Sequence, residues 1–380
     1  MRFVIILFLI CTCVADAKTV CLNMIVKDES AIIERCLNSC KDKIDYWVIV
    51  DMGSCDATKQ IICQCMKNKP GELHERSWVN FEYNRNEALD LARDKADYIL
   101  FIDADQRLEF EPTFNEATLE DPYYYVTTEE PGGLTSKHIL LVDASYPWHW
   151  TGSVHESISC EGMVLDFQRS MNGVKLINVQ DGCHASDPNR HLKDAETLEI
   201  EVRKNPTDSH AVFCLAQCYL NANQKILALK YYERRVQMEG SLDEKWYSLY
   251  TVARLHDEMG FPSDVITKEY CQAFQQRPIR AEPLGLLALH HLQRGNFILA
   301  YALAVQALGI KKPQDGYFVE DWFYEYGSLC IYADSARCLG AKEQALKAYQ
   351  HVLKRECLPE GVRSKIKKTV EELSAPISIK

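Results

Sequence analysis

The sequence predicts two structural units, an α/β unit with a mainly parallel sheet followed by an all-α unit of helical repeats. Two observations predict the first unit: short apolar runs alternate with segments of helical spacing, and each run ends in polar residues. Strands and helices that alternate in this way form parallel sheets with right-handed crossovers. The third observation is that only helical spacing remains after about Leu192. We expect a signal peptide over residues 1–17, the α/β domain over 18–190 and the helical-repeat domain over 191–380.

The composition limits the kinds of molecule that the protein is expected to bind. A chain of 380 residues with 47% hydrophobic and 26% charged residues is typical of globular protein and long enough for two domains. Its net charge of −11 argues against a nucleic-acid partner, because phosphate contacts need clustered lysine and arginine. A partner held by acidic groups through a cation fits this charge better.

The amino end has the pattern of a secretory signal peptide. Arg2 precedes an apolar run over Val4–Val14, and Ala15-Asp16-Ala17 is a small-x-small cleavage pattern. The run is short for a membrane span, so we expect cleavage after Ala17, no transmembrane segment in the mature chain, and a secretory-lumen, secreted or virion-associated protein. An uncleaved anchor and a cytoplasmic location are the alternatives. The sixteen cysteines permit disulfides in such a compartment, but spacing does not predict which would pair.

The elements of the first unit follow one another in a regular order. Strands are predicted over Thr19–Val26, Ile44–Val50, Glu75–Trp78 and Tyr98–Ile102, with helices over Ala31–Cys40, Ile61–Met66 and Glu82–Lys95. Further strands over Tyr123–Thr128 and His138–Val142 would complete the sheet. Tyr98–Ile102 is apolar throughout, which is typical of a strand buried on both faces.

Polar residues follow three of these strands. Lys27 and Glu29 come after the first strand, Asp51 after the second, and Asp103 and Asp105 after the fourth. The carboxyl ends of parallel strands share one edge, where open α/β sheets bind ligands. Carboxylates at that edge suit Mg²⁺ or Mn²⁺ carrying a diphosphate. The alternative is that Asp103 only caps the next turn.

Four motifs in this order resemble the signatures of inverting family-2 glycosyltransferases. They are Leu22-Asn23-Met24-Ile25-Val26-Lys27-Asp28-Glu29, Val48-Ile49-Val50-Asp51-Met52-Gly53-Ser54-Cys55-Asp56-Ala57-Thr58, Tyr83-Asn84-Arg85-Asn86-Glu87-Ala88-Leu89 and Ile99-Leu100-Phe101-Ile102-Asp103-Ala104-Asp105. The similarity covers about residues 18–184 and implies a nucleotide-sugar-binding domain of the GT-A type. Met52 and Gln106 depart from the commoner residues, but neither is a proposed ligand.

The resemblance assigns roles to these residues. It implies that Lys27, Glu29, Asp51, Arg85 and Asp103 bind the nucleotide-sugar, and that Asp103 and Asp105 form the metal-binding motif. A histidine after the last strand would complete the ligands of Mn²⁺ or Mg²⁺. Of the two histidines in this stretch, His184 is preferred over His191 because it directly follows a strand, and a solvent-facing His184 is the alternative.

A candidate base follows a tryptophan-rich stretch. Inverting transfer needs a group that removes a proton from the acceptor as it attacks the anomeric carbon. Similar sequences carry Val-His-Glu here, which makes Glu156 the candidate base and His155 the second choice. The alternative is that both only hydrogen-bond their own loop. Trp148 and Trp150 fit either sugar stacking or core packing.

The second half contains related units with a small residue at each turn. Asn223, Gly260, Gly295 and Gly340 recur about every 35 to 45 residues, close to the period of tetratricopeptide (TPR) helix pairs. Each is followed five positions later by a small apolar residue, namely Ala228, Val265, Ala300 and Ala345. The longer last interval indicates an insertion over Gln314–Asp321 or a degenerate last unit. This half is similar to the repeats behind transferase domains in some bacterial and large-virus proteins.

Together these patterns favour a metal-dependent inverting glycosyltransferase that uses a nucleotide-diphosphate sugar, a UDP-sugar as first choice. The acceptor would be a glycan or a protein, and the repeats would bind a protein partner or a second copy. The alternative is a TPR-type interaction or scaffold protein whose transferase-like domain only binds.

Overall fold

The computed structural model describes residues 18–112, 114, 119–130, 134–166, 169–313 and 318–375. The predicted signal peptide therefore lies outside the described residues. Contacts divide the chain into two compact units: the first comprises residues up to 127, 138–151 and 158–183, and the second comprises 128–137, 152–157 and 184 onward. Among the helices of the described ranges, none combines the length and apolar character that crossing a bilayer requires.

The first unit is built on an eight-stranded mixed sheet with the order β3-β2-β1-β4-β7-β6-β10-β5. Strands β1 to β4 run parallel, whereas β7 is antiparallel to β4 and β5 is antiparallel to β10. The predicted parallel sheet is therefore present and is extended by antiparallel strands. The strands are β1 (Val20–Val26), β2 (Tyr46–Asp51), β3 (Gly71–Glu75), β4 (Tyr98–Phe101), β5 (Gln106–Phe110), β6 (Tyr123–Glu130), β7 (Leu134–Asp143), β10 (Ser170–Asn178), and the separate pair β8 (Trp148–Thr151) and β9 (Ser157–Cys160).

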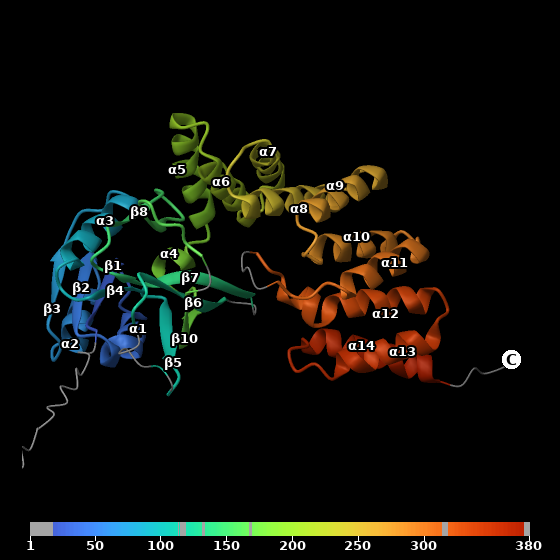
Figure 1. Cartoon of the computed structure of the whole chain (residues 1–380), viewed down its shortest axis with the longest axis horizontal. Helices are drawn as coiled ribbons and strands as arrows, with labels where there is room; N and C mark the ends of the chain where they lie inside the picture. Colours follow the sequence, from blue (N-terminus) through green and yellow to red (C-terminus); the bar gives the residue numbers. More distant parts are fainter. Residues whose placement is uncertain are drawn as a thin grey trace, which may run out of the picture. The chain divides into compact units, whose positions relative to one another are not determined.

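Helices cover both faces of the parallel strands (Figure 1). Leu22 and Met24 of β1 belong to one apolar cluster with residues of α1 (Ile33–Cys40) and α2 (Thr58–Cys65). Cys21 of the same strand belongs to a second cluster, with residues of α3 (Phe81–Ala92) and with Trp148 and Trp150. Because both faces are buried, the central strands read as continuous apolar runs.

The third strand lies earlier than the sequence predicted. β3 spans Gly71–Glu75 rather than Glu75–Trp78 and pairs with β2 from Trp47 to Asp51. A Cβ atom at Gly71 would overlap the Trp47 ring, so this position accepts the tryptophan only because it is glycine. The strand pattern missed this segment because its residues are mostly polar and half-buried.

The second unit consists of helices packed as successive antiparallel pairs (Figure 1). Helix α6 packs on α7, α8 on α9, α10 on α11 and α12 on α13. A π-helical turn over Phe323–Gly327 precedes α12, in the long last interval that the sequence indicated, although residues 314–317 lie outside the described part. The helices are α4 (Cys183–Ser186), α5 (Arg190–Lys204), α6 (Ser209–Asn221), α7 (Lys225–Val236), α8 (Leu242–Glu258), α9 (Ser263–Gln276), α10 (Glu282–Gln293), α11 (Phe297–Leu308), α12 (Ser328–Cys338), α13 (Lys342–Leu353) and α14 (Glu360–Ser374).

The repeat turns have the backbone that their residues predict. Asn223, Gly260, Gly295 and Gly340 lie between the helices of each pair with φ values of 57°, 77°, 78° and 80°. This left-handed conformation ends a helix and favours glycine or asparagine. Of the small apolar residues expected five positions later, Ala228, Ala300 and Ala345 are fully buried.

The second repeat departs from the predicted spacing. Val265 is only partly buried, and Ile266 occupies the buried position instead. Helix α9 begins three residues after Gly260, whereas α7, α11 and α13 begin two residues after their turn residue. Because the turn before α9 is one residue longer and contains Pro262, the buried position on α9 lies one residue later than in the other repeats.

All fourteen cysteines that the structure describes are free thiols. In the described part of the second unit, the fully buried side chains of Tyr232, Trp246, Tyr250, Tyr270 and Tyr349 lie on paired helices. The fully buried Phe323 lies in the π-helical turn. These aromatic residues belong to the apolar clusters of the helical unit.

Candidate active site

The carboxyl ends of three parallel strands bring the predicted acidic residues to one edge of the sheet. Val26 at the end of β1 pairs with Asp51 at the end of β2. On the other side, Asn23 of β1 pairs with Phe101, the last residue of β4, so Asp103 and Asp105 follow directly. The strand register therefore places these acidic residues as the sequence predicted.

Hydrogen bonds join the turns that follow β1 and β2. The backbone N–H of Asp28 donates to Ser54 Oγ at 2.9 Å, and Cys55 N–H donates to Asp28 Oδ1 at 2.7 Å. One residue later, Glu29 N–H donates to Thr58 Oγ1 at 2.8 Å. Asp28 has a φ of 55°, a left-handed conformation that these bonds maintain. The Ser54 hydroxyl is thus used by Asp28, and Asp56 Oδ1 accepts from Thr58 N–H, at the start of α2, at 2.9 Å.

Asp51 is fully buried and only partly satisfied. Its Oδ1 accepts hydrogen bonds from Gly53 N–H at 3.0 Å and from Ser54 N–H at 2.8 Å. Its other oxygen, Oδ2, has no hydrogen-bond donor within the described part of the chain. A buried carboxylate oxygen without a donor is costly, so this atom is suited to accept a hydrogen bond from a ligand.

Asp103 is held by an arginine from α3. Arg85 Nη2 lies 2.9 Å from Asp103 Oδ1 and 3.1 Å from Oδ2, and the guanidinium lies 5.0 Å from the centre of the Trp150 ring. The Gln106 side chain accepts from Asp103 N–H at 3.0 Å and so stabilises the turn after β4. Arg85, predicted to bind the donor, therefore positions the first carboxylate of the motif in this structure.

Glu29 and Asp105 lie together around Gly182. A Cβ atom at Gly182 would lie 3.1 Å from Glu29 Oε1 and 3.3 Å from Asp105 Cβ. The Glu29 carboxylate accepts a hydrogen bond from Cys183 N–H at 3.0 Å, where α4 begins. Burial, and then the nearby charge of Asp105, raise the pKa of Glu29 to about 7. Burial and the charge of Asp103 raise the pKa of Asp105 to about 6.

A bidentate ion pair holds the segment that carries Gly182. Arg35 of α1 contacts both oxygens of Asp181 at 2.7 Å, which keeps the pKa of that carboxyl below its usual value. Sequence reasoning did not select Arg35, Asp181 or Gly182. The available signal was the position of Asp181-Gly182 directly after the last strand.

The remaining predicted site residues are distributed over both units. Lys27 is exposed after β1. His155 and Glu156 lie in the turn 152–157, which belongs to the helical unit, and the backbone of His184 lies in α4. The side chain of His184, the predicted third metal ligand, is outside the described residues. Trp148 and Trp150 are buried against the sheet and form part of its core.

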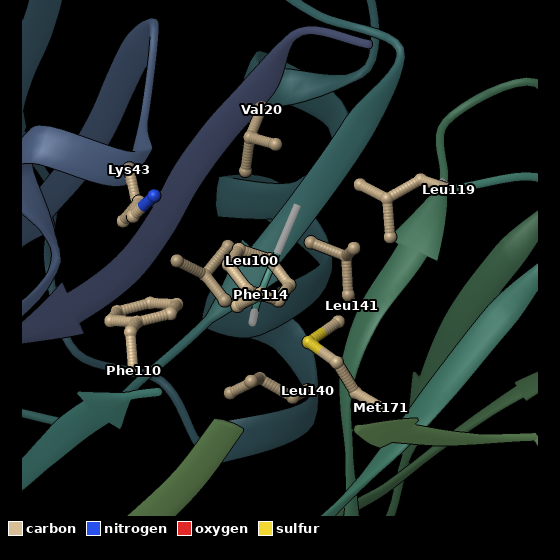
Figure 2. Close-up of a pocket in the computed structure, with 9 residues that line it drawn as sticks. All are labelled: Val20, Lys43, Leu100, Phe110, Phe114, Leu119, Leu140, Leu141 and Met171. Atoms are coloured by element: carbon tan, nitrogen blue, oxygen red, sulfur yellow. The ribbon is translucent and has the colours of Figure 1, made fainter. Parts of the chain in front are cut away.

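A small hollow in the first unit is a gap in apolar packing rather than part of this site. Figure 2 shows its lining, in which every residue except Lys43 is apolar. Lys43 Nζ lies 5.8 Å and 5.4 Å from the ring centres of Phe110 and Phe114. The lining offers no carboxylate, so it does not match the chemistry of the acidic edge. The residues are Val20, Lys43, Leu100, Phe110, Phe114, Leu119, Leu140, Leu141 and Met171.

Part of the first unit is similar to glycosyltransferases. Residues 21–117 match the family described as Glycosyl transferase family 2. The chain is 38% identical over 93 residues to the SPbeta prophage-derived glycosyltransferase SunS of Bacillus subtilis, covering 24% of this chain and 21% of that protein. It is also 38% identical over 98 residues to a TPR repeat-containing protein of Synechococcus elongatus, covering 26% of this chain and 23% of that one. The chain thus matches about a fifth of the length of these relatives.

Solved TPR proteins are similar to the helical part of the chain. A thermophilic TPR protein of Thermus thermophilus aligns with 48% of this chain and 92% of its own, at 17% identity and a TM-score of 0.35. The C-terminal part of a TPR repeat-containing protein of Cytophaga hutchinsonii aligns with 48% of this chain and 68% of its own, at 13% identity and a TM-score of 0.39.

Proposed function

We propose that the protein is a metal-dependent inverting glycosyltransferase that moves a sugar from a nucleotide-diphosphate donor, a UDP-sugar as first choice, to a glycan or protein acceptor. The observation that carries this proposal is the group of carboxylates at the carboxyl edge of the parallel strands. Asp51 has an oxygen without a donor, and Glu29 and Asp105 have raised pKa values. The match of this segment to family 2 supports the same chemistry.

The donor set fits a hard divalent cation. Asp103 and Asp105 offer carboxylate oxygens, which Mg²⁺ and Mn²⁺ prefer, and the charge of Asp105 acts on Glu29. Charge supports this fit, because burial and neighbouring carboxylates make Glu29 and Asp105 costly to ionise, and a bound cation would offset that cost. We propose that Asp103, Asp105 and His184 would hold Mn²⁺ or Mg²⁺, which when bound would supply positive charge against the diphosphate.

The protein groups have separate roles in this proposal. Asp51 accepts a hydrogen bond from the nucleotide, and Lys27 and Arg85 attract its phosphates. Glu156 accepts the proton of the acceptor hydroxyl while that oxygen bonds to the anomeric carbon and the bond to the diphosphate breaks. Attack from the face opposite the leaving group inverts the anomeric configuration.

The test is a thermal-shift panel of nucleotides and nucleotide-sugars, with and without Mn²⁺, followed by a turnover assay with the donor it identifies. A ligand of the folded state raises the melting temperature by mass action. We expect an Mn²⁺-dependent shift with the wild type and with the control Asp90→Asn, an exposed carboxylate on α3. Asp105→Asn should lose the Mn²⁺-dependent part and at least about a hundredfold in turnover.

Two outcomes would contradict the proposal. Full turnover in Asp105→Asn would exclude the metal role of Asp105. The absence of a shift with every nucleotide would favour the alternative, in which the helical pairs bind a protein and the first unit is not catalytic.

A further inference from the structure

A cluster of three metal-ligating side chains lies outside the acidic site, within the second unit. The ligating atoms of His155, Asp194 and Cys218 all lie within 4.8 Å of one another. His155 Nε2 is 3.2 Å from Cys218 Sγ. This is the one such group of three among the residues that the structure describes.

Three separate segments bring these residues together. His155 lies in the turn 152–157, Asp194 in α5 and Cys218 in α6. The turn is fastened to the same helices by two further contacts. Val154 is buried in a cluster with Ala195 and other residues of α5 and α6, and the Ser153 hydroxyl donates to Glu201 of α5.

We propose that His155, Asp194 and Cys218 bind a zinc ion, with a water molecule as the fourth ligand. One imidazole, one carboxylate and one thiolate form a mixed donor set typical of Zn²⁺ rather than of Mg²⁺ or Ca²⁺. Tetrahedral zinc places its ligand atoms about 3.4 to 3.6 Å apart, so the present separations need only small side-chain movements.

Access and burial are consistent with an ion at this place. Cys218 is fully buried, Asp194 is partly buried and His155 is exposed, so the ion would bind from the solvent side with the sulfur beneath it. The Cys218 thiol releases its proton to solvent on binding, because zinc binds the thiolate. His155 has a φ of 55°, so its position depends on surrounding contacts, and a metal bond would add one.

The site would change the role of His155. A ring nitrogen bonded to zinc has no lone pair left to remove a proton, so His155 would not act as the second candidate base. It would instead hold the turn 152–157, which carries Glu156, against helices α5 and α6. The zinc site does not depend on the proposed transferase activity, because none of its three ligands belongs to the acidic edge.

Cobalt substitution tests the proposal directly, since Co²⁺ bound to a thiolate gives a near-ultraviolet charge-transfer band. We expect one equivalent of Co²⁺ to produce this band in the full chain, and Zn²⁺ to displace it. Cys218→Ala should abolish the band. The matched control is Cys214→Ala, one turn earlier on α6. The buried Cys214 Sγ lies 3.5 Å from His210 Nε2, and among the described residues this pair is not part of such a group of three.

Two further variants keep the test independent of folding and of the transferase. Asp194→Asn, at a partly buried position, should weaken Co²⁺ binding by at least about tenfold while the circular-dichroism melt is unchanged. Asp105→Asn should keep the band, which separates this site from the acidic edge. A wild-type protein without the band, or a band that survives in Cys218→Ala, would overturn the proposal.

Discussion

At the residue scale, the acidic edge depends on how closely Gly182 approaches Glu29 and Asp105. A methyl group at this position would lie 3.1 Å from Glu29 Oε1 and 3.3 Å from Asp105 Cβ, which is tighter than most side-chain contacts. Gly182 does not have a positive φ, so its role is to leave space rather than to relieve backbone strain.

Gly182→Ala should therefore weaken Mn²⁺-dependent nucleotide binding by about tenfold. The added methyl group would push the Glu29 and Asp105 side chains away from the positions in which they act on the ion. The fold should be retained. The control is Gly361→Ala on α14, where nothing lies within 4 Å of the added methyl group. Calorimetric titration measures both, and equal affinities for the two variants would contradict the role of Gly182.

The raised pKa of Glu29 predicts how stability changes with pH. Its pKa of about 7 in the folded protein exceeds the ordinary 4.5, so folding favours the protonated form. The stabilisation that Glu29 gives the folded state is complete below pH 4.5 and is lost as the pH rises through 7. The metal-free wild type should therefore lose stability over that interval, and Glu29→Gln should lose less. Denaturant titrations at several pH values measure the difference, and parallel curves would exclude Glu29 as the cause.

Metal binding should have the opposite pH dependence, because the cation needs ionised carboxylates. With pKa values of about 6 for Asp105 and about 7 for Glu29, we expect Mn²⁺ affinity about tenfold lower at pH 6 than at pH 8. Calorimetric titration at the two pH values measures this. Equal affinities would show that neither carboxylate takes part.

At the element scale, the sequence predicted the buried positions of the repeats correctly wherever the turn between the two helices had the same length. A left-handed residue between two helices is a local requirement, so Asn223 and three glycines marked all four turns. Which residues of a helix are buried does not depend on the local sequence alone. One additional residue before α9 moved the core position from Val265 to Ile266, which the regular spacing could not show.

This shift gives a matched pair of variants. Ile266→Ala should destabilise the helical unit by about 2 to 5 kcal/mol, because it removes a fully buried side chain. Val265→Ala, at a partly buried position, should cost less than about 1.5 kcal/mol. Denaturant unfolding measures both changes. Equal losses would contradict the observed register of α9.

At the scale of the whole molecule, the excess of acidic residues sets the kind of partner. A net charge of −11 repels phosphates unless a cation or a local basic group intervenes. At the acidic edge the proposed basic groups are Lys27 and Arg85, and the charge of Arg85 is shared with Asp103.

We therefore expect no binding of labelled single-stranded or double-stranded oligonucleotides at physiological salt, in contrast to nucleotide-sugar binding in the presence of Mn²⁺. Fluorescence anisotropy measures this. A salt-dependent micromolar affinity would show that a basic surface exists despite the net charge.

The amino-acid sequence by itself determined the mainly parallel sheet, the acidic residues at its carboxyl edge and the helical repeats. Each depends on patterns within a single element, such as an apolar run that ends in carboxylates. Only the tertiary structure decided that Arg85 pairs with Asp103, that Gly182 lies against Glu29 and Asp105, and that His155 contacts Cys218. These contacts join residues far apart in the chain, and no local pattern encodes which distant side chain will face another once the core has packed.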